Sequence, residues 1–377
     1  MKNSISDHPA IRILLIFLAA ETLMLSWAWG MRRLVPDYYP EGATELYQGV
    51  KQEINPLLEP WQRWDTMHYQ AIAERGYTAF EMAYYPIYPF LMGWLAPIFG
   101  GNTLVSGLTI SGLAFLGCLL TIHKLSTLEF GEEVSAMRVV VYMAFYPAAF
   151  FLVAAYNESL FLLEVMLCLY FIKKENWLRA GLFAGIAALT RVPGVLLALP
   201  LGYAAWHAWK KGSHTSWLAM GVMVLELIGY YIYQWLWLGQ LPFVTIAAQN
   251  QRGGYLAFPG LNILETVRRI SIGQMVGENS FELLFTLGFI VFTILIWRKL
   301  PRIYGLYAAS LMFLFMIRMG SPQPLISNMR YTFEIFPVFF LFARWGDKPA
   351  IHRVILYLSW LGLLFFGAQF AIWGWVG

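Results

Sequence analysis

Charged residues are scarce in this 377-residue chain: they make up 13% of it, whereas the hydrophobic fraction is 59%. Soluble domains average about a quarter charged residues, so this composition excludes an ordinary soluble protein and indicates a polytopic membrane protein. No polar block is long enough to fold alone, so a single membrane domain is expected over residues 1–377. The net charge of +4 points to no particular partner, and no nucleic acid is expected.

Cysteine is almost absent, since Cys118 and Cys168 are the only two and both fall within apolar segments. A structural disulfide is therefore not expected, and no cysteine spacing typical of a metal site exists. The chain also lacks a Gly-rich phosphate loop before a helix, so no nucleotide cofactor is expected. No small-residue cleavage site follows the first apolar run, so residues 11–31 are predicted to be a retained first helix.

Eleven apolar segments approach the roughly 20 residues that a spanning helix needs, and several are interrupted by Pro or Gly. Such breaks are tolerated where the backbone lines a cavity instead of facing lipid. The chain is therefore predicted to be an all-α protein with about eleven transmembrane helices. The predicted spans are residues 11–31, 103–122, 139–155, 158–172, 180–191, 194–209, 215–238, 282–297, 303–319, 331–343 and 354–374.

The short basic loops predict the orientation of these spans, because cytoplasmic loops carry an excess of Lys and Arg. Lys124 to Arg138, Lys173-Lys174 and Lys210-Lys211 all fall on the cytoplasmic side if every segment crosses once. The N-terminus is then inside and the C-terminus outside. Arg32-Arg33, at the outer end of the first helix, goes against the rule.

Two long outer loops follow from this topology, residues 32–102 and residues 239–281. Within the first, the aromatic and Pro-rich stretch 84–99 is predicted to form a helix that lies in the membrane interface. Several polar breaks between apolar segments share the outer side, which predicts a functional site there. They include Asp65, Asn157, Arg191, Arg318 and Arg330.

The polar stretch 61–69 brings a carboxylate and an imidazole together with two tryptophans. Asp65 precedes His68 by three residues, so in a helical turn the two side chains share a face. The carboxylate could accept a proton from an attacking hydroxyl. Two other interpretations stay open, a helix N-cap and an Asp-x-x-His metal site, although no second acidic cluster accompanies the pair. Trp64 and Tyr69 favour a functional role, because aromatic faces suit sugar rings as well as interface anchoring.

Three further charges interrupt apolar segments. Glu158 opens a short helix, where it either complements the helix dipole or orients an acceptor. Arg191 precedes Pro193-Gly194, and a guanidinium at membrane depth costs about 2.5–3.5 kcal/mol on insertion scales, so it normally has a partner or a task. A phosphate bound bidentately would fit, and an interfacial anchor is the alternative. Arg330 stands four residues before Glu334, so an intrahelical ion pair is its simplest interpretation.

Five short strings along residues 63–337 carry a resemblance to a known family. They are Arg63-Trp64-Asp65 with His68-Tyr69, Tyr85-Pro86-Ile87-Tyr88-Pro89, Tyr156-Asn157-Glu158-Ser159, Thr190-Arg191 with Gly194, and Arg330-Tyr331 with Phe336-Pro337. In this order they resemble the PIG-V type of mannosyltransferase, which adds the second mannose in glycosylphosphatidylinositol assembly, and its bacterial relatives. Two residues depart from the family pattern: Asn157 stands where Ser or Thr is usual, and Pro193 where eukaryotic members have Asn.

The resemblance implies the GT-C fold and a catalytic Asp in the first outer loop, which carries over to Asp65 as general base. The residues predicted to bind the substrates are Arg63, Trp64, His68, Tyr69, Asn157, Glu158, Arg191, Arg330 and Tyr331. The compact length favours a bacterial member in the cytoplasmic membrane, with its active site on the outer face.

The predicted reaction is inverting transfer of mannose, without a metal or other cofactor. The donor would be a polyprenyl-phosphate sugar, and the acceptor a glycolipid or another lipid-linked molecule held among membrane lipids. The alternative is a polytopic transporter or flippase for lipids or sugars. Transporters place charges near the bilayer midplane in paired halves, and no internal repeat is found here.

Overall fold

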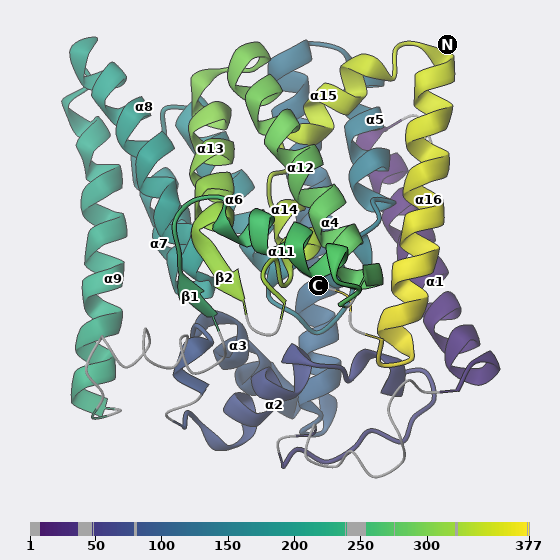
Figure 1. Ribbon diagram of the computed structural model, residues 1–377. Helices are drawn as coiled ribbons and strands as arrows, with labels where there is room; N and C mark the ends of the chain where they lie inside the picture. Colours follow the sequence, from purple (N-terminus) through teal and green to yellow (C-terminus); the bar gives the residue numbers. More distant parts are fainter. Residues whose placement is uncertain are drawn as a thin grey trace. The chain divides into compact units, whose positions relative to one another are not determined.

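The computed structural model is built from helices, with one short pair of strands in the part of the chain that it describes (Figure 1). It describes residues 8–36, 47, 49–78, 81–237, 239, 254–274, 276–320, 323–374 and 376. Parts of both predicted outer loops lie outside these residues, namely 37–46, 48 and 79–80 in the first loop and 240–253 and 275 in the second.

The chain divides into two compact units that interleave along the sequence. The first contains residues 1–75, 88–166 and 339–375, and the second contains residues 76–87, 167–338 and 376–377. The division falls within α6 (Glu158–Lys173).

The first unit is organised around the helices α1, α4, α5 and α16. Its elements are α1 (Pro9–Leu34), η3 (Glu59–Trp61), α2 (Asp65–Arg75), α3 (Ile87–Leu95), η5 (Ala96–Phe99), α4 (Thr103–Phe130), α5 (Glu133–Ala144), η6 (Ala149–Leu152), the start of α6, α15 (Val338–Trp345) and α16 (Pro349–Ala371). α1 lies beside α16, where the Trp27 indole N–H donates to the Leu364 carbonyl over 2.7 Å.

The short helix α2 is fixed to α4 by polar side chains within the first unit. Gln70 donates to the Thr103 hydroxyl over 3.0 Å, and that hydroxyl donates to the Glu74 carboxylate over 2.7 Å. Gln62 donates to Gln70 over 3.0 Å and so extends the network to the segment before the helix. A buried polar network that is well satisfied gives a segment one defined position. The polar stretch predicted as the functional centre is therefore part of the folded unit.

The second unit contains two helix pairs and the strands. Its elements are η4 (Glu81–Ala83), the end of α6, α7 (Trp177–Thr190), η7 (Val192–Leu197), α8 (Ala198–Lys210), η8 (His214–Trp217), α9 (Leu218–Trp237), β1 (Gly254–Leu256), α11 (Leu261–Ser271), α12 (Val276–Lys299), α13 (Arg302–Ile317), β2 (Arg318–Gly320) and α14 (Asn328–Thr332). β1 and β2 pair antiparallel, with Leu256 opposite Arg318 (Figure 1).

α7 and α9 approach closely because α7 carries the small-residue pattern Gly181-x-x-x-Gly185. A Cβ atom on Gly181 would stand 2.4 Å from the Ala219 carbonyl oxygen of α9. At Gly185 the Glu226 side chain occupies the corresponding space. Close backbone contact of this kind is typical of helices that pack inside a membrane, where van der Waals contact replaces the hydrophobic effect.

Five helices of the described ranges are long and apolar enough to cross a membrane. They are Pro9–Leu34, Thr103–Phe130, His214–Leu236, Val276–Lys299 and Pro349–Ala371. The protein is thus an all-α multi-pass membrane protein, as predicted. The number of eleven crossings stays a prediction, as does the interfacial position of residues 84–99, where α3 and η5 form.

Two of the predicted spans do not form continuous helices. Residues 139–155 contain the end of α5 and the separate turn η6, with Pro147 between them. Residues 331–343 contain the end of α14 and most of α15, with Pro337 between them. Proline lacks a backbone N–H and disfavours helical geometry in the residue before it, so both interruptions follow from the sequence. The prediction of a single helix was wrong in both places.

Candidate active site

The predicted catalytic stretch meets the Tyr156–Ser159 break at the start of α2, and both belong to the first unit. The backbone N–H of Asp65 donates to the Tyr156 hydroxyl over 3.3 Å, and that hydroxyl donates to the Arg63 carbonyl over 3.4 Å. The Thr66 hydroxyl lies 3.4 Å from the Ala155 carbonyl. Two strings separated by about ninety residues in sequence therefore fix the same turn.

Asp65 is the first residue of α2, and it follows a residue with unusual backbone geometry. Trp64 has φ +46°, in the left-handed region that bulky side chains rarely occupy. Trp64, Asp65 and His68 are half-buried, whereas Thr66, Met67 and Tyr69 are buried. The carboxylate and the imidazole therefore share the accessible side of the first turn, as the three-residue spacing predicted. Because the helix already includes Asp65, this residue does not stand at the N-cap position.

Arg63 holds the segment before α2 in place. Its guanidinium is fully buried and donates to Ala371 O (2.9 Å and 3.3 Å), Glu59 O (2.6 Å), Gln62 O (3.1 Å) and the Glu59 carboxylate (2.7 Å). It also lies 4.4 Å from the centre of the Trp373 ring. An Arg offers five N–H donors, and these contacts use all five. We therefore interpret Arg63 as a positioning residue for Trp64 and Asp65.

Tyr69 lies on the buried side of α2, and a chain of contacts connects it to Tyr156, which holds the first turn of that helix. Its ring packs edge-on against Tyr88 at 5.0 Å, and Tyr88 shares a 2.8 Å hydrogen bond with Ser111. The Ser111 hydroxyl donates to the Tyr156 carbonyl over 3.0 Å. Burial raises the pKa of Tyr88, the hydrogen bond with Ser111 opposes this rise, and the nearby Glu158 charge adds to it. The phenol therefore stays protonated at neutral pH.

Glu158 is fully buried at the first position of α6, and Asn157 before it is also buried. The Asn157 carbonyl accepts the N–H of Phe161 over 2.9 Å, the normal first bond of that helix. A carboxylate in a first helical turn complements the helix dipole. This position fits the dipole interpretation, and Glu158 also adds negative charge next to Tyr88.

Arg191, Arg330 and Tyr331 form a second group, which lies in the second unit. Arg191 leaves the end of α7 in an extended conformation (φ −153°, ψ 148°), so the predicted break is present. Its guanidinium lies 3.0 Å from the buried carboxylate of Glu334. It is also 5.2 Å from the centre of the Tyr331 ring.

Three guanidinium groups lie around the Tyr331 ring. Those of Arg318, Arg191 and Arg330 are 4.8 Å, 5.2 Å and 5.6 Å from its centre. Cations prefer an aromatic face, but three like charges in one place repel each other. Glu334 offsets part of this charge next to Arg191. The arrangement is suited to an anion such as a phosphate, which guanidinium groups bind bidentately.

The turn before Arg330 is held by a buried carboxylate from α12. Glu282 accepts the backbone N–H of Ser327 over 3.1 Å and that of Met329 over 2.7 Å. Ser327 has φ +66°, and Asn328 donates to the Thr286 hydroxyl over 3.1 Å. α14 ends at Thr332, so Arg330 and Glu334 do not share a helix. The interpretation of an intrahelical ion pair was therefore wrong.

Four residues that contribute to these two groups were not predicted from the sequence as catalytic or substrate-binding residues. Tyr156 appeared only as part of a string, Glu334 only as a partner of Arg330, and Arg318 only as a polar position. Glu282 received no role. A carboxylate at the edge of an apolar segment was the one available signal for Glu282. In the described ranges, no group of three or more His, Cys, Asp or Glu could hold a metal ion.

Comparison with known proteins identifies the family. A family model described as mannosyltransferase (PIG-V) matches residues 14–209, just over half of the chain. The chain belongs to the mannosyltransferase (PIG-V) family. The resemblance inferred from five short strings is thus confirmed. The PIG-V match includes Asp65, Glu158 and Arg191, whereas Arg318 and Arg330 lie beyond it.

Relatives within the PIG-V family are about a quarter identical to this chain over the stretch that aligns. The GPI alpha-1,6-mannosyltransferase 2 of Cricetulus griseus is 28% identical over 189 residues, which are 46% of this chain and 38% of that protein. The GPI mannosyltransferase 2 of Yarrowia lipolytica is 26% identical over 191 residues, half of each chain. The matched stretch therefore spans half or less of these relatives.

A solved structure shows the fold that this PIG-V family member adopts. ArnT from Cupriavidus metallidurans, determined with bound undecaprenyl phosphate, aligns with 96% of this chain and 68% of its own. The TM-score is 0.57 and the sequence identity 14%. The likeness confirms the predicted GT-C fold.

Proposed function

We propose that this protein is an inverting mannosyltransferase that moves mannose from a polyprenyl-phosphate carrier to a lipid-linked or glycolipid acceptor. The family of the chain supports mannose transfer. The fold shared with an enzyme that was solved with undecaprenyl phosphate supports a lipid-phosphate donor. The proposal further places the protein in a bacterial cytoplasmic membrane, with the acceptor on the outer face.

The observation that carries the proposal is the first turn of α2. Asp65 stands on its accessible side with His68, while Arg63, Thr66 and Tyr156 fix the backbone beneath it. A general base must be held within hydrogen-bond reach of the proton that it removes. Contacts on the buried side hold this turn in place, whereas the side that carries Asp65 and His68 is partly accessible. The turn therefore meets this requirement.

In the proposed reaction the acceptor hydroxyl oxygen attacks the anomeric carbon of mannose and forms the new glycosidic bond. Asp65 takes the hydroxyl proton as the bond forms. The bond between the anomeric carbon and the phosphate oxygen breaks on the opposite face, and its electron pair leaves with the polyprenyl phosphate. One displacement inverts the configuration at this carbon, as expected for a base that acts on the acceptor.

We propose that Arg191 and Arg330 bind the lipid phosphate, with Tyr331 supporting both guanidinium groups. The leaving phosphate gains negative charge as the bond breaks. Positioned donors that stabilise such charge usually supply the largest catalytic contribution. Trp64, His68 and Asn157 are proposed to contact the sugar or the acceptor.

A transfer assay tests this function directly. Purified protein in lipid nanodiscs would receive radiolabelled polyprenyl-phosphate mannose together with native lipid extract. We expect label to appear in a new glycolipid, and GDP-mannose supplied alone should give none. Movement of the labelled donor between leaflets without any new product would instead support the flippase alternative and overturn the transferase proposal.

A further inference from the structure

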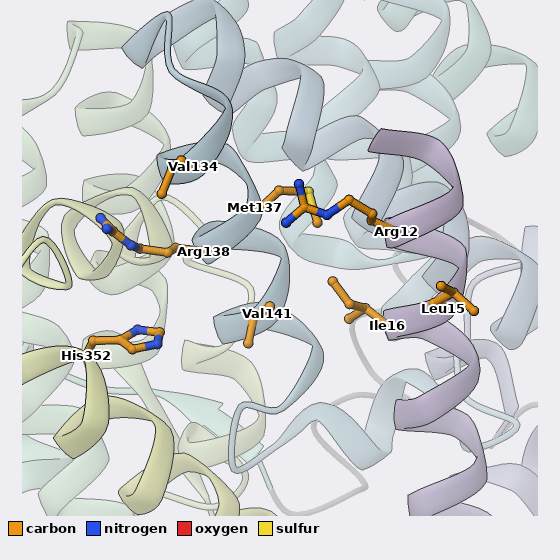
Figure 2. Close-up of a pocket in the computed structure, with 8 residues that line it drawn as sticks. All are labelled: Arg12, Leu15, Ile16, Val134, Met137, Arg138, Val141 and His352. Carbon is orange, nitrogen blue, oxygen red and sulfur yellow. The ribbon is translucent and has the colours of Figure 1, made fainter. Parts of the chain in front are cut away.

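A groove opens in the first unit between α1, α5 and α16, and none of the candidate site residues described above lines it (Figure 2). Its volume is about 460 Å³, within the range of small-molecule sites. Apolar side chains from two helices line it, chiefly Leu15 and Ile16 of α1 and Met137 and Val141 of α5. A surface of this kind in a membrane protein is covered by acyl chains.

Three basic side chains stand around the groove, and two of them are already engaged. Arg138 forms an ion pair with Asp347 and also contacts the Ala343 carbonyl. The His352 ring shares a 2.6 Å hydrogen bond with the Tyr142 hydroxyl. These contacts connect α5 with α15, with the turn before α16 and with the first turns of α16. They leave little positive charge for a ligand.

Arg12 differs from the other two. It belongs to the second turn of α1, and its side chain extends across the groove toward Met137 (Figure 2). Among the described residues it has no acidic partner, and no acidic side chain lines the groove. A guanidinium at the edge of an apolar groove is complementary to a phosphate attached to a hydrocarbon chain.

The polar side-chain contacts of α1 are unevenly distributed along the helix in the described part of the chain. Its polar side-chain contacts to other elements of the described chain, Trp27 to Leu364 and Arg32 to Glu59, lie in its second half. Its first half is held by apolar contacts such as Phe17 against Phe115 at 5.6 Å. A ligand between α1 and α5 would add a polar contact to the first half of α1.

We propose that the groove binds one anionic phospholipid of the surrounding membrane. Its phosphate contacts Arg12, and one acyl chain lies between Ile16 of α1 and Val141 of α5. Basic pockets between transmembrane helices are known to bind anionic head groups. The site is separate from the proposed transferase chemistry, so the two proposals can fail independently.

Native mass spectrometry of the full-length protein tests this site. The protein would be titrated with phosphatidylglycerol or with phosphatidylcholine of the same chain length. We expect one phosphatidylglycerol molecule to be retained preferentially and to raise the melting temperature. Arg12→Gln should weaken phosphatidylglycerol binding about five-fold, as expected for one basic residue near a lipid head group. Ile16→Trp should fill the groove and weaken both lipids.

The control is Arg33→Gln, which removes the same charge from the other end of α1. It should leave phosphatidylglycerol binding unchanged. An equal loss with Arg33→Gln, or no loss with Arg12→Gln, would overturn the proposal. Displacement of the lipid by millimolar inorganic phosphate would also contradict it, because the acyl chain is meant to contribute most of the affinity.

Discussion

At the scale of single residues, the buried arginines Arg63 and Arg191 of the matched strings serve different purposes. Arg63 is surrounded by carbonyls and one carboxylate that use all five of its N–H donors. Arg191 instead stands beside Glu334 and the Tyr331 ring, where two further guanidinium groups gather. Repulsion among like charges makes this second environment favourable for an anion. The surroundings of an Arg, and not its burial, distinguish a positioning role from a binding role.

Replacing Arg191 by Lys should therefore affect the donor more than the fold. Lys keeps the charge but loses the planar fork that binds phosphate bidentately. We expect the KM for polyprenyl-phosphate mannose to rise roughly ten-fold, the effect of losing one charge-assisted hydrogen bond. The melting temperature in detergent should change little.

The matched control is Arg179→Lys at the other end of α7, where Arg179 stacks on Phe171 at 5.4 Å. Donor kinetics should not change in that variant. Unchanged donor kinetics in Arg191→Lys itself would return Arg191 to the role of an interfacial anchor.

At the scale of elements, short breaks between helices place the candidate residues. The break after α7 depends on Gly194, since a Cβ atom there would stand 2.3 Å from the carbonyl carbon and oxygen of Ala187. The Gly194 N–H also donates to the Arg191 carbonyl over 2.9 Å. Any larger residue must push η7 away from α7, and Arg191 moves with it.

Gly194→Ala should accordingly destabilise the protein by about 1–3 kcal/mol, the usual cost of overpacking. It should also weaken donor use, because Arg191 shifts. Gly202→Ala on α8 is the control, since its Cβ would meet only Met220 Sδ at 3.8 Å, an ordinary contact. Melting curves and donor KM are the measurements, and equal behaviour of the two variants would refute the steric argument.

A second element-scale prediction concerns the turn that precedes α14. Glu282→Gln replaces one acceptor oxygen by an NH₂ group, which then faces the N–H of Ser327 or Met329. Leaving a buried N–H unsatisfied costs about 1–3 kcal/mol. We expect a lower melting temperature and a higher donor KM, because Arg330 and Tyr331 follow this turn directly.

The control is Glu278→Gln, one turn earlier on α12. It should neither lower the melting temperature nor raise the donor KM. Partial recovery in Glu282→Asp would support positioning through the carboxylate. A raised KM without any loss of stability would contradict the capping account and indicate direct contact with the donor.

At the scale of the whole molecule, the orientation of the helices decides on which side the chemistry takes place. The basic short loops predict that the segment before α2 faces outward and the end of α8 inward. Both native cysteines are buried, so single exposed cysteines can be introduced without background labelling. Leu57 and Gly212 are exposed positions on the two predicted sides.

Leu57→Cys should react with an impermeant maleimide added to intact cells, and Gly212→Cys should react only after the membrane is opened. This difference follows directly from the predicted topology. Labelling of both positions from the same side would contradict the outer location of the active site.

Much of this architecture could be predicted from the sequence, because apolar segments and breaks are local features. The helical start at Asp65, the break at Arg191 and the start of α6 at Glu158 all depend on neighbouring residues. The pairing of Arg191 with Glu334 depends on elements 143 residues apart, and no local pattern specifies it. Arg318, which lies near Tyr331, stands opposite Leu256 in the pair of strands, and no local pattern specifies this pairing either.

The central claim is that Asp65 is the general base, and one substitution tests it most directly. Asp65→Asn is nearly isosteric and should leave the fold, lipid binding and melting temperature close to those of the wild type. The measurement is single-turnover transfer from polyprenyl-phosphate mannose in nanodiscs, with Glu278→Gln on α12 as the control. We expect Asp65→Asn to slow transfer by about 10²–10⁴-fold, the usual contribution of a general base, and Glu278→Gln to transfer at nearly the wild-type rate.

Asn has nearly the shape of Asp and loses only the negative charge in the first turn of α2, worth about 0.3–1 kcal/mol, so a purely structural Asp65 would leave the variant folded and active. Transfer by Asp65→Asn within a few-fold of the wild type would therefore contradict the account and remove Asp65 from the chemistry.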